Sequence, residues 1–217
     1  MSAIAFTRRQ EIAAALPRVV AHLRSGGLLA YPTETVYGLG CRARTPDVRV
    51  LQQLKGRTQD RPFLVLVSDR EMATAHGLEF NEAANALAGS FWPGPLTLVL
   101  AGGAGRLPGE LRGEGGGIAV RQTSHGGIAR LVAELGEPLT STSANLPGRP
   151  PAPGVAAILR DFAAAVESGS LLVLDGGVLG AAPPSTLVDC TGPTPRLIRE
   201  GAVTRAEVER VVGPLAA

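Results

Sequence analysis

The fold class is set by the stretch Leu28-Leu-Ala-Tyr-Pro-Thr-Glu-Thr-Val-Tyr-Gly-Leu-Gly40, which joins a strand signal to a candidate ligand site. Its first four residues form a short apolar run, which predicts a buried strand. Thr33 and Thr35 follow, and side-chain alternation points both the same way if the strand geometry continues. The glycines after them let backbone approach a ligand closely. A strand end with an ordinary β-turn is the alternative, and composition alone favours it.

Helical and strand signals alternate on both sides of this stretch. Capping pairs such as Thr7 with Gln10, Ser68 with Glu71 and Thr204 with Glu207 predict helix starts. Further helices are expected at Thr45, Asn81, His125 and Val155, and strands over residues 28–31, 63–67, 96–100, 118–121, 138–141, 171–175, 186–188 and 196–198. This order predicts a single α/β (α+β) domain over residues 1–217, with helices flanking one twisted, mixed sheet.

Composition limits the class of protein. The 217 residues are 45% hydrophobic, and 21 Lys plus Arg nearly balance 19 Asp plus Glu, which does not indicate a nucleic-acid binder. Two cysteines without CxxC spacing argue against a disulfide scaffold or zinc ribbon. We expect a cytoplasmic protein without a signal peptide or membrane helix.

The segment Lys55-Gly-Arg57, with Arg61 after it, gathers three cations at the end of a predicted helix. Lys55 is the only lysine of the chain, which indicates either a need for a compact point charge or chance. Cations at a helix C-terminus also stabilise its dipole. A polyphosphate clamp and a purely structural role are therefore both open.

A second polar segment, Thr140-Ser-Thr-Ser-Ala-Asn145, follows a predicted strand. Such a string can bind phosphate, ribose or a small polar substrate, or it can be a turn whose hydroxyls bond their own backbone. The sequence contains no Walker loop, no G-x-G-x-x-G between a strand and a helix, and no G-x-S-x-G. His22, His76 and His125 lie far apart, so no protein-held metal is expected.

Taken together, these segments resemble the YrdC-like family of threonylcarbamoyl-AMP synthases. The resemblance runs over nearly the whole chain. It is carried by the motifs Tyr31-Pro-Thr-Glu-Thr-Val-Tyr-Gly-Leu-Gly40, Lys55-Gly-Arg57, Phe91-Trp-Pro-Gly-Pro-Leu-Thr97, Ala119-Val-Arg121, Ser143-Ala-Asn145-Leu-Pro-Gly148, Pro184-Ser-Thr186 with Val188-Asp189, and Ile198-Arg199.

The resemblance implies a deep basic cavity that holds ATP and L-threonine side by side. Bicarbonate would join threonine as a carbamate, which would attack the α-phosphorus of ATP and release pyrophosphate. Mg²⁺ would be held mainly by the ATP phosphates, and partner proteins of tRNA modification would receive the adenylate. Lys55 and Arg57 are the implied catalytic residues. The implied ATP-binding residues are Lys55, Arg57, Arg61, Ser143, Asn145 and Arg199, and the implied threonine-binding residues are Thr33, Thr35, Arg121, Ser141 and Ser185.

Two departures and two rival functions accompany this reading. Leu66 stands where some relatives have a histidine, and the C-terminal domain of longer members is not present in this sequence. The same fold is associated with double-stranded RNA, so an RNA-binding module with salt-sensitive affinity is the main alternative. A paralogue without the reaction is the second, but we expect it to lack part of the Lys-x-Arg and Ser-x-Asn set.

Overall fold

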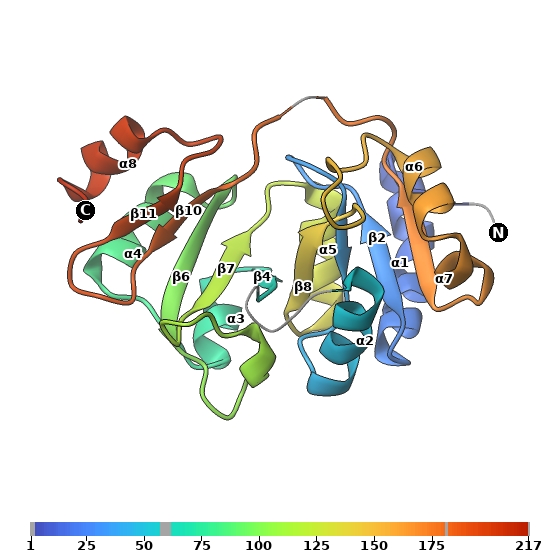
Figure 1. Cartoon of the computed structure of the whole chain (residues 1–217), viewed down its shortest axis with the longest axis horizontal. Coiled ribbons are helices and arrows are strands. Elements are labelled where there is room, and N and C mark those ends of the chain that lie inside the picture. The colour runs from blue at the N-terminus through green and yellow to red at the C-terminus, as the bar shows by residue number, and fades with distance from the viewer. Residues whose placement is uncertain (1–2, 57–61, 181, 217) are drawn as a thin grey trace.

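The computed structural model describes residues 3–56, 62–180 and 182–216, and its strands form one mixed sheet (Figure 1). The strands are β1 Ile4–Ala5, β2 Leu28–Tyr31, β3 Gly38–Gly40, β4 Leu64–Val67, β5 Leu78–Glu79, β6 Leu96–Gly102, β7 Ile118–Gln122, β8 Leu139–Ser143, β9 Leu171–Asp175, β10 Thr186–Asp189 and β11 Arg196–Arg199. The helices are α1 Arg9–Arg24, α2 Thr45–Lys55, α3 Arg70–Ala75, α4 Glu82–Phe91, α5 Gly126–Leu135, α6 Val155–Asp161, α7 Ala163–Glu167 and α8 Arg205–Val212, with a 3₁₀ turn at Gly109–Leu111.

The sheet follows the order β1-β9-β2-β3-β8-β4-β7-β6-β10-β11, and β5 pairs with β6 outside this path. β2 with β9, β4 with β7 and β6 with β10 run parallel, whereas β8 is antiparallel to both β3 and β4. The predicted mixed sheet with flanking helices is therefore confirmed. None of the helices in the described part of the chain is long and apolar enough to cross a membrane.

Two apolar cores cover the two faces of the sheet. α1 and α5 pack together over one face, where their leucines, valines and isoleucine meet Leu29, Leu66 and Leu139. The larger core gathers side chains of α2, α4, α6, α7 and α8 with the residues of the other face, such as Val65 and Leu98. The connection from β9 to β10 passes over the top of the sheet from one half of the molecule to the other (Figure 1).

Helix starts are found close to the predicted places, but two caps use a different residue. In α1 the N-cap is Arg8 and not Thr7, and Glu11, not Gln10, accepts the backbone N–H of Thr7 at 3.1 Å and the Thr7 hydroxyl at 2.7 Å. Asp69, not Ser68, caps α3, where its carboxylate accepts the Met72 N–H. In both cases an ionised carboxylate replaces a neutral group, and it is the stronger acceptor at the positive end of a helix.

The sequence did not predict β3. A Cβ on Gly40 would lie 1.9 Å from the carbonyl oxygen of Thr140 on β8, and one on Gly38 would lie 3.0 Å from the ring of Tyr31. These glycines therefore allow protein backbone and a buried tyrosine to pack closely. The expected close approach is real, but at Gly40 it is made to the neighbouring strand.

Candidate active site

A cavity of about 720 Å³ opens on the sheet between β2 and β10 in the sheet order. Its lining comes from the loop after β2, from β3, β4, β6, β7, β8, β10 and β11, from the segments before β4 and after β8, and from the connection between β9 and β10. Along β4, Leu64 lines the cavity while Leu66, two residues on, is buried in the α1–α5 core. The cavity therefore lies on the same face of the sheet as α1 and α5.

The five residues predicted to hold threonine all line this cavity: Thr33, Thr35, Arg121, Ser141 and Ser185. Ser143 and Arg199, from the predicted ATP set, line it as well. The described lining includes these two arginines and no Asp or Glu. The cavity is thus basic, as the resemblance implies, although the chain as a whole is almost neutral.

Arg121 is the most unusual of these side chains. It comes from β7 and is only 3% exposed. Its Nε and Nη1 atoms are buried and have no hydrogen-bond acceptor among the described residues. Its Nη1 lies 3.2 Å from Oε1 of Glu34, a close ionic contact. A buried guanidinium with unused donors is costly, and such groups are typical of sites that receive an anion.

Arg199 reaches the cavity from the edge strand β11. Its Nη2 donates to the Ser185 carbonyl at 2.8 Å. Burial, and then the charge of Arg121, lower the pKa of Arg199 from its ordinary value. Both guanidinium groups line the same cavity, which favours an anionic ligand between or beside them.

The threonines of the loop after β2 differ in how their hydroxyls are used. Thr33 Oγ1 donates to the Val36 carbonyl at 2.7 Å and accepts the N–H groups of Thr35 and Val36. The side-chain bonds of Thr33 therefore hold the bend that follows β2, where a turn was the alternative to a ligand site. Thr35 Oγ1 has one side-chain contact, with Thr33 Oγ1 at 3.1 Å. Thr35 is the better placed of the two to bond a ligand.

Lys55 ends α2 and lies against the segment after β8. Its ammonium donates to the Ser143 carbonyl at 2.9 Å, to Oδ1 of Asn145 at 3.0 Å and to the Asn145 carbonyl. Ser143 Oγ donates to the same Asn145 Oδ1 at 2.7 Å. The structure therefore brings Lys55 together with Ser143 and Asn145, which lie 88 and 90 positions after it in the chain. Arg57 and Arg61 lie outside the described residues.

The hydroxyl string 140–145 is mostly strand. Thr140 to Ser143 belong to β8, so the turn expected as its alternative structure is wrong for these residues. Ser141, Thr142 and Ser143 all line the cavity, while the Thr140 hydroxyl bonds both the N–H and the carbonyl of Cys41. Thr140 is therefore engaged by protein backbone, which leaves the three residues after it as candidates to bond a ligand.

Sequence reasoning missed Thr97, which lines the cavity and is 1% exposed. Its Oγ1 lies 2.9 Å from Oγ of Ser185. The signal was available, because Thr97 closes one of the quoted motifs, but no role was attached to it. Leu66 is fully buried beside Arg121 in the β4–β7 register and does not line the cavity. The glycine-rich segment of residues 102–117 contributes no residue to the cavity lining.

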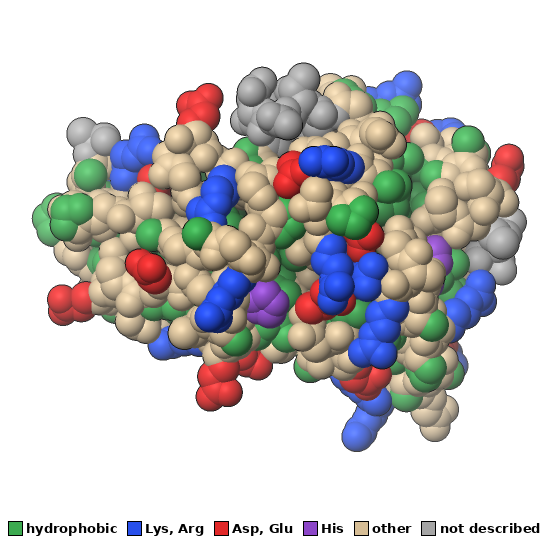
Figure 2. All heavy atoms as spheres, turned by 90° about the horizontal axis from the view of Figure 1, so that it is seen from below, with side chains coloured by type: hydrophobic (Ala, Val, Ile, Leu, Met, Phe, Trp, Pro, Cys, Tyr) green, Lys and Arg blue, Asp and Glu red, His purple; other side chains and the backbone are tan. Residues whose placement is uncertain are grey.

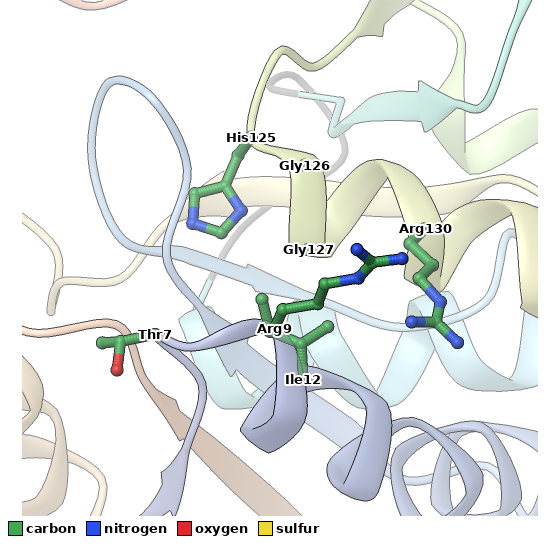
Figure 3. A pocket seen from close by; sticks show the side chains of 7 residues that line it. All are labelled: Thr7, Arg9, Ile12, His125, Gly126, Gly127 and Arg130. Carbon is green, nitrogen blue, oxygen red and sulfur yellow. The ribbon is translucent and has the colours of Figure 1, made fainter.

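A second hollow, of about 730 Å³, lies between the starts of α1 and α5. Figure 3 shows Arg9 reaching from α1 toward Arg130 on α5, with His125 at the start of α5. Burial lowers the pKa of His125, whose Nδ1 accepts the Ile128 N–H. This hollow contains none of the predicted site residues. Among the described residues no three His, Cys, Asp or Glu side chains form a metal-binding cluster.

Comparison with known proteins adds independent support. A threonylcarbamoyl-AMP synthase of Bacillus subtilis (strain 168) is 32% identical over 201 residues, which span 92% of this chain and 57% of that protein. One from Thiobacillus denitrificans is 39% identical over 176 residues, or 81% of this chain and 90% of that protein. The crystal structure of Pyrococcus abyssi Sua5 complexed with L-threonine superposes with a TM-score of 0.85 at 33% identity, covering 99% of this chain and 62% of that one.

The chain thus spans less than two thirds of the Bacillus and Pyrococcus proteins but most of the Thiobacillus one. The sequence model of the Sua5/YciO/YrdC family, described as telomere recombination, matches residues 21–201. That match includes every described residue of the cavity lining. The chain belongs to the Sua5/YciO/YrdC family.

Proposed function

We propose that this protein is a threonylcarbamoyl-AMP synthase, which forms threonylcarbamoyl-adenylate and pyrophosphate from L-threonine, bicarbonate and ATP. The observation that carries the proposal is the pairing of two cationic groups around one basic cavity. Arg121 offers unused donors inside it, and Lys55, which does not itself line it, bonds Asn145 and the carbonyl of Ser143, a residue of the lining. The names of the relatives agree with this chemistry.

The amino-acid end of the proposed site is built around Arg121. A guanidinium matches the two oxygens of a carboxylate, so we assign it the carboxylate of threonine. Thr35, Ser141 and Ser185 supply hydroxyls around it, and Thr33 fixes the turn that carries Thr35. The L-threonine bound to the Pyrococcus protein is consistent with such a site.

The nucleotide end is assigned to Lys55, Ser143, Asn145 and Arg199, together with Arg57 and Arg61 of the undescribed segment. Cations here would offset the charge of the phosphates, and Lys55 and Arg57 would stabilise the charge that gathers on the leaving pyrophosphate. The described residues offer no carboxylate cluster for a metal, so we propose that Mg²⁺ arrives on the ATP phosphates.

The reaction then needs no covalent enzyme intermediate. The amine of threonine adds to the carbon of bicarbonate, and loss of water leaves a carbamate. A carbamate oxygen bonds to the α-phosphorus as the bond from that phosphorus to the pyrophosphate oxygen breaks. Both reactants are anions, so holding them in line between cations lowers the barrier.

The wider setting is proposed on the same basis. The adenylate would pass to partner proteins that modify tRNA, in the cytoplasm, from a protein whose 217 residues form one domain. A duplex-RNA module fits less well. On the face seen in Figure 2, Arg and Lys side chains are interspersed with Asp and Glu, without a continuous basic track.

The test is pyrophosphate release by the purified chain with MgATP, bicarbonate and single amino acids. We expect release only when both threonine and bicarbonate are present. Pyrophosphate release that does not depend on bicarbonate would overturn the proposal. So would the absence of release with threonine, together with tight, salt-sensitive binding of duplex RNA.

A further inference from the structure

A partly buried polar chain connects Arg121 to residues that do not line the cavity. The Thr123 hydroxyl donates to Oε2 of Glu34 at 2.5 Å, and the backbone N–H of His125 donates to Thr123 Oγ1 at 3.2 Å. The other carboxylate oxygen of Glu34, Oε1, lies 3.2 Å from Nη1 of Arg121. Neither Glu34 nor Thr123 lines the cavity, whereas Arg121 does.

The contact between Glu34 and Arg121 is ionic without being a hydrogen bond. Oε1 of Glu34 and the Nε and Nη1 of Arg121 all remain without a hydrogen-bond partner among the described residues. The carboxylate thus attracts the guanidinium, yet leaves these N–H donors unused. An incoming anion can therefore take them without first displacing Glu34.

Solvent screens the charges of Glu34 and Arg121 only weakly. The side chains of Glu34 and Arg121 are 16% and 4% exposed, so this is not a surface pair whose energy is lost to solvent. Without the negative charge of Glu34, Arg121 would lose the ionic contact that offsets its buried charge and fixes the direction of its guanidinium.

We infer that Glu34, oriented by Thr123, is a positioning residue that aims the guanidinium of Arg121 at the substrate carboxylate. The inference rests on the proposed function and deepens it, because it assigns the acidic residue of the threonine-rich loop to the amino-acid half of the site. Glu34 touches no substrate and moves no proton. Its effect is on the affinity for the amino acid.

The test measures binding of L-threonine and of ATP separately, by calorimetry on the full chain and its variants. Glu34→Gln keeps the shape and removes the charge, and Thr123→Val keeps the shape and removes the hydroxyl. We expect each to weaken threonine binding, Glu34→Gln by about tenfold or more, and to leave ATP binding within about twofold. Thr123→Ser restores the hydroxyl and should rescue the affinity.

Glu137→Gln is the matched control. The side chain of Glu137 is 17% exposed and also pairs with arginines, Arg42 and Arg44, but it lies away from the cavity. It should bind threonine as the wild type does. Wild-type affinity in Glu34→Gln, or an equal loss of threonine and ATP binding, would overturn the inference. A wild-type protein that binds no threonine would instead overturn the proposed function, and the inference with it.

Discussion

The two cationic groups of the site are held in opposite ways. Lys55 ends a helix, and its ammonium is engaged by three oxygens of Ser143 and Asn145. Arg121 stands on a central strand, where its Nε and Nη1 are buried without a hydrogen-bond acceptor among residues 3–56, 62–180 and 182–216. Lys55 thus holds a segment of the protein itself, whereas Arg121 makes an ionic contact with Glu34 that leaves these donors unused.

This difference predicts different roles for the two cations in the proposed reaction. Because Lys55 is bonded to backbone and side-chain oxygens, nucleotide phosphates would have to share or replace those bonds. The amino-acid end needs no such exchange, because its donors are already unused. We therefore expect amino-acid binding to depend steeply on the one group Arg121, and nucleotide binding to be spread over several groups.

Removal of Arg121 should give the largest effect. Arg121→Ala deletes the carboxylate partner and leaves Glu34 buried without its counter-charge. We expect kcat/KM for threonine to fall about a thousandfold, measured by threonine titration at saturating ATP. Arg130→Ala, at an exposed arginine paired with Glu134 on α5, serves as the control and should be neutral. A loss of tenfold or less in Arg121→Ala would break the comparison.

Removal of the Lys55 charge should come next. Lys55→Met retains much of the apolar stem but cannot donate to Ser143 and Asn145, so we expect kcat/KM for ATP to fall about a hundredfold. The measurement is ATP titration at saturating threonine. Arg49→Met, on the exposed side of the same helix, is the matched control. If the variant lost threonine affinity alone, the division between the two ends would be wrong.

How much of the structure could be predicted from the sequence depends on the kind of residue. Short apolar runs predicted β2 and β9 to the residue, because core strands leave a strong pattern in the chain. β3 was missed, since a Gly-Leu-Gly strand has almost no side-chain signal and its place is set by contact with Tyr31 and Thr140. Local rules cannot see such long-range packing.

The site shows the same limit. Motif resemblance named residues that the fold does gather, as the contacts of Lys55 with Asn145 illustrate. It attached no role to Thr97 and named no partner for Glu34. Their roles depend on a neighbour from another strand, Ser185 for one and Arg121 for the other, which pairing of distant strands decides.

Thr97 offers a smaller and more local test. Thr97→Val keeps the buried shape but removes the bond to the Ser185 hydroxyl. We expect the KM for threonine to rise about fivefold with kcat little changed, as one neutral hydrogen bond is typically lost. Thr74→Val, which removes an exposed hydroxyl of α3, is the control. An equal rise in the KM for ATP would show that Ser185 does not belong to the amino-acid end.

The smallest effect is expected from modification of the thiols, because it should affect neither the amino-acid end nor the nucleotide end of the site. Burial raises the pKa of Cys41 to about 12 and that of Cys190 to about 12, so almost no thiolate forms at pH 8. Iodoacetamide should leave the folded protein unmodified in intact mass and fully active, yet label both thiols after unfolding. Rapid labelling with loss of activity would place a reactive thiol in the site.

The most direct test of the central claim is the product itself. The purified chain would be incubated with MgATP, L-threonine and either ordinary or ¹³C-labelled bicarbonate, and the adenylate mass measured. The account predicts a threonylcarbamoyl-adenylate whose mass rises by one unit with the labelled bicarbonate. A product that carries threonine but no bicarbonate carbon, or no adenylate at all, would contradict it.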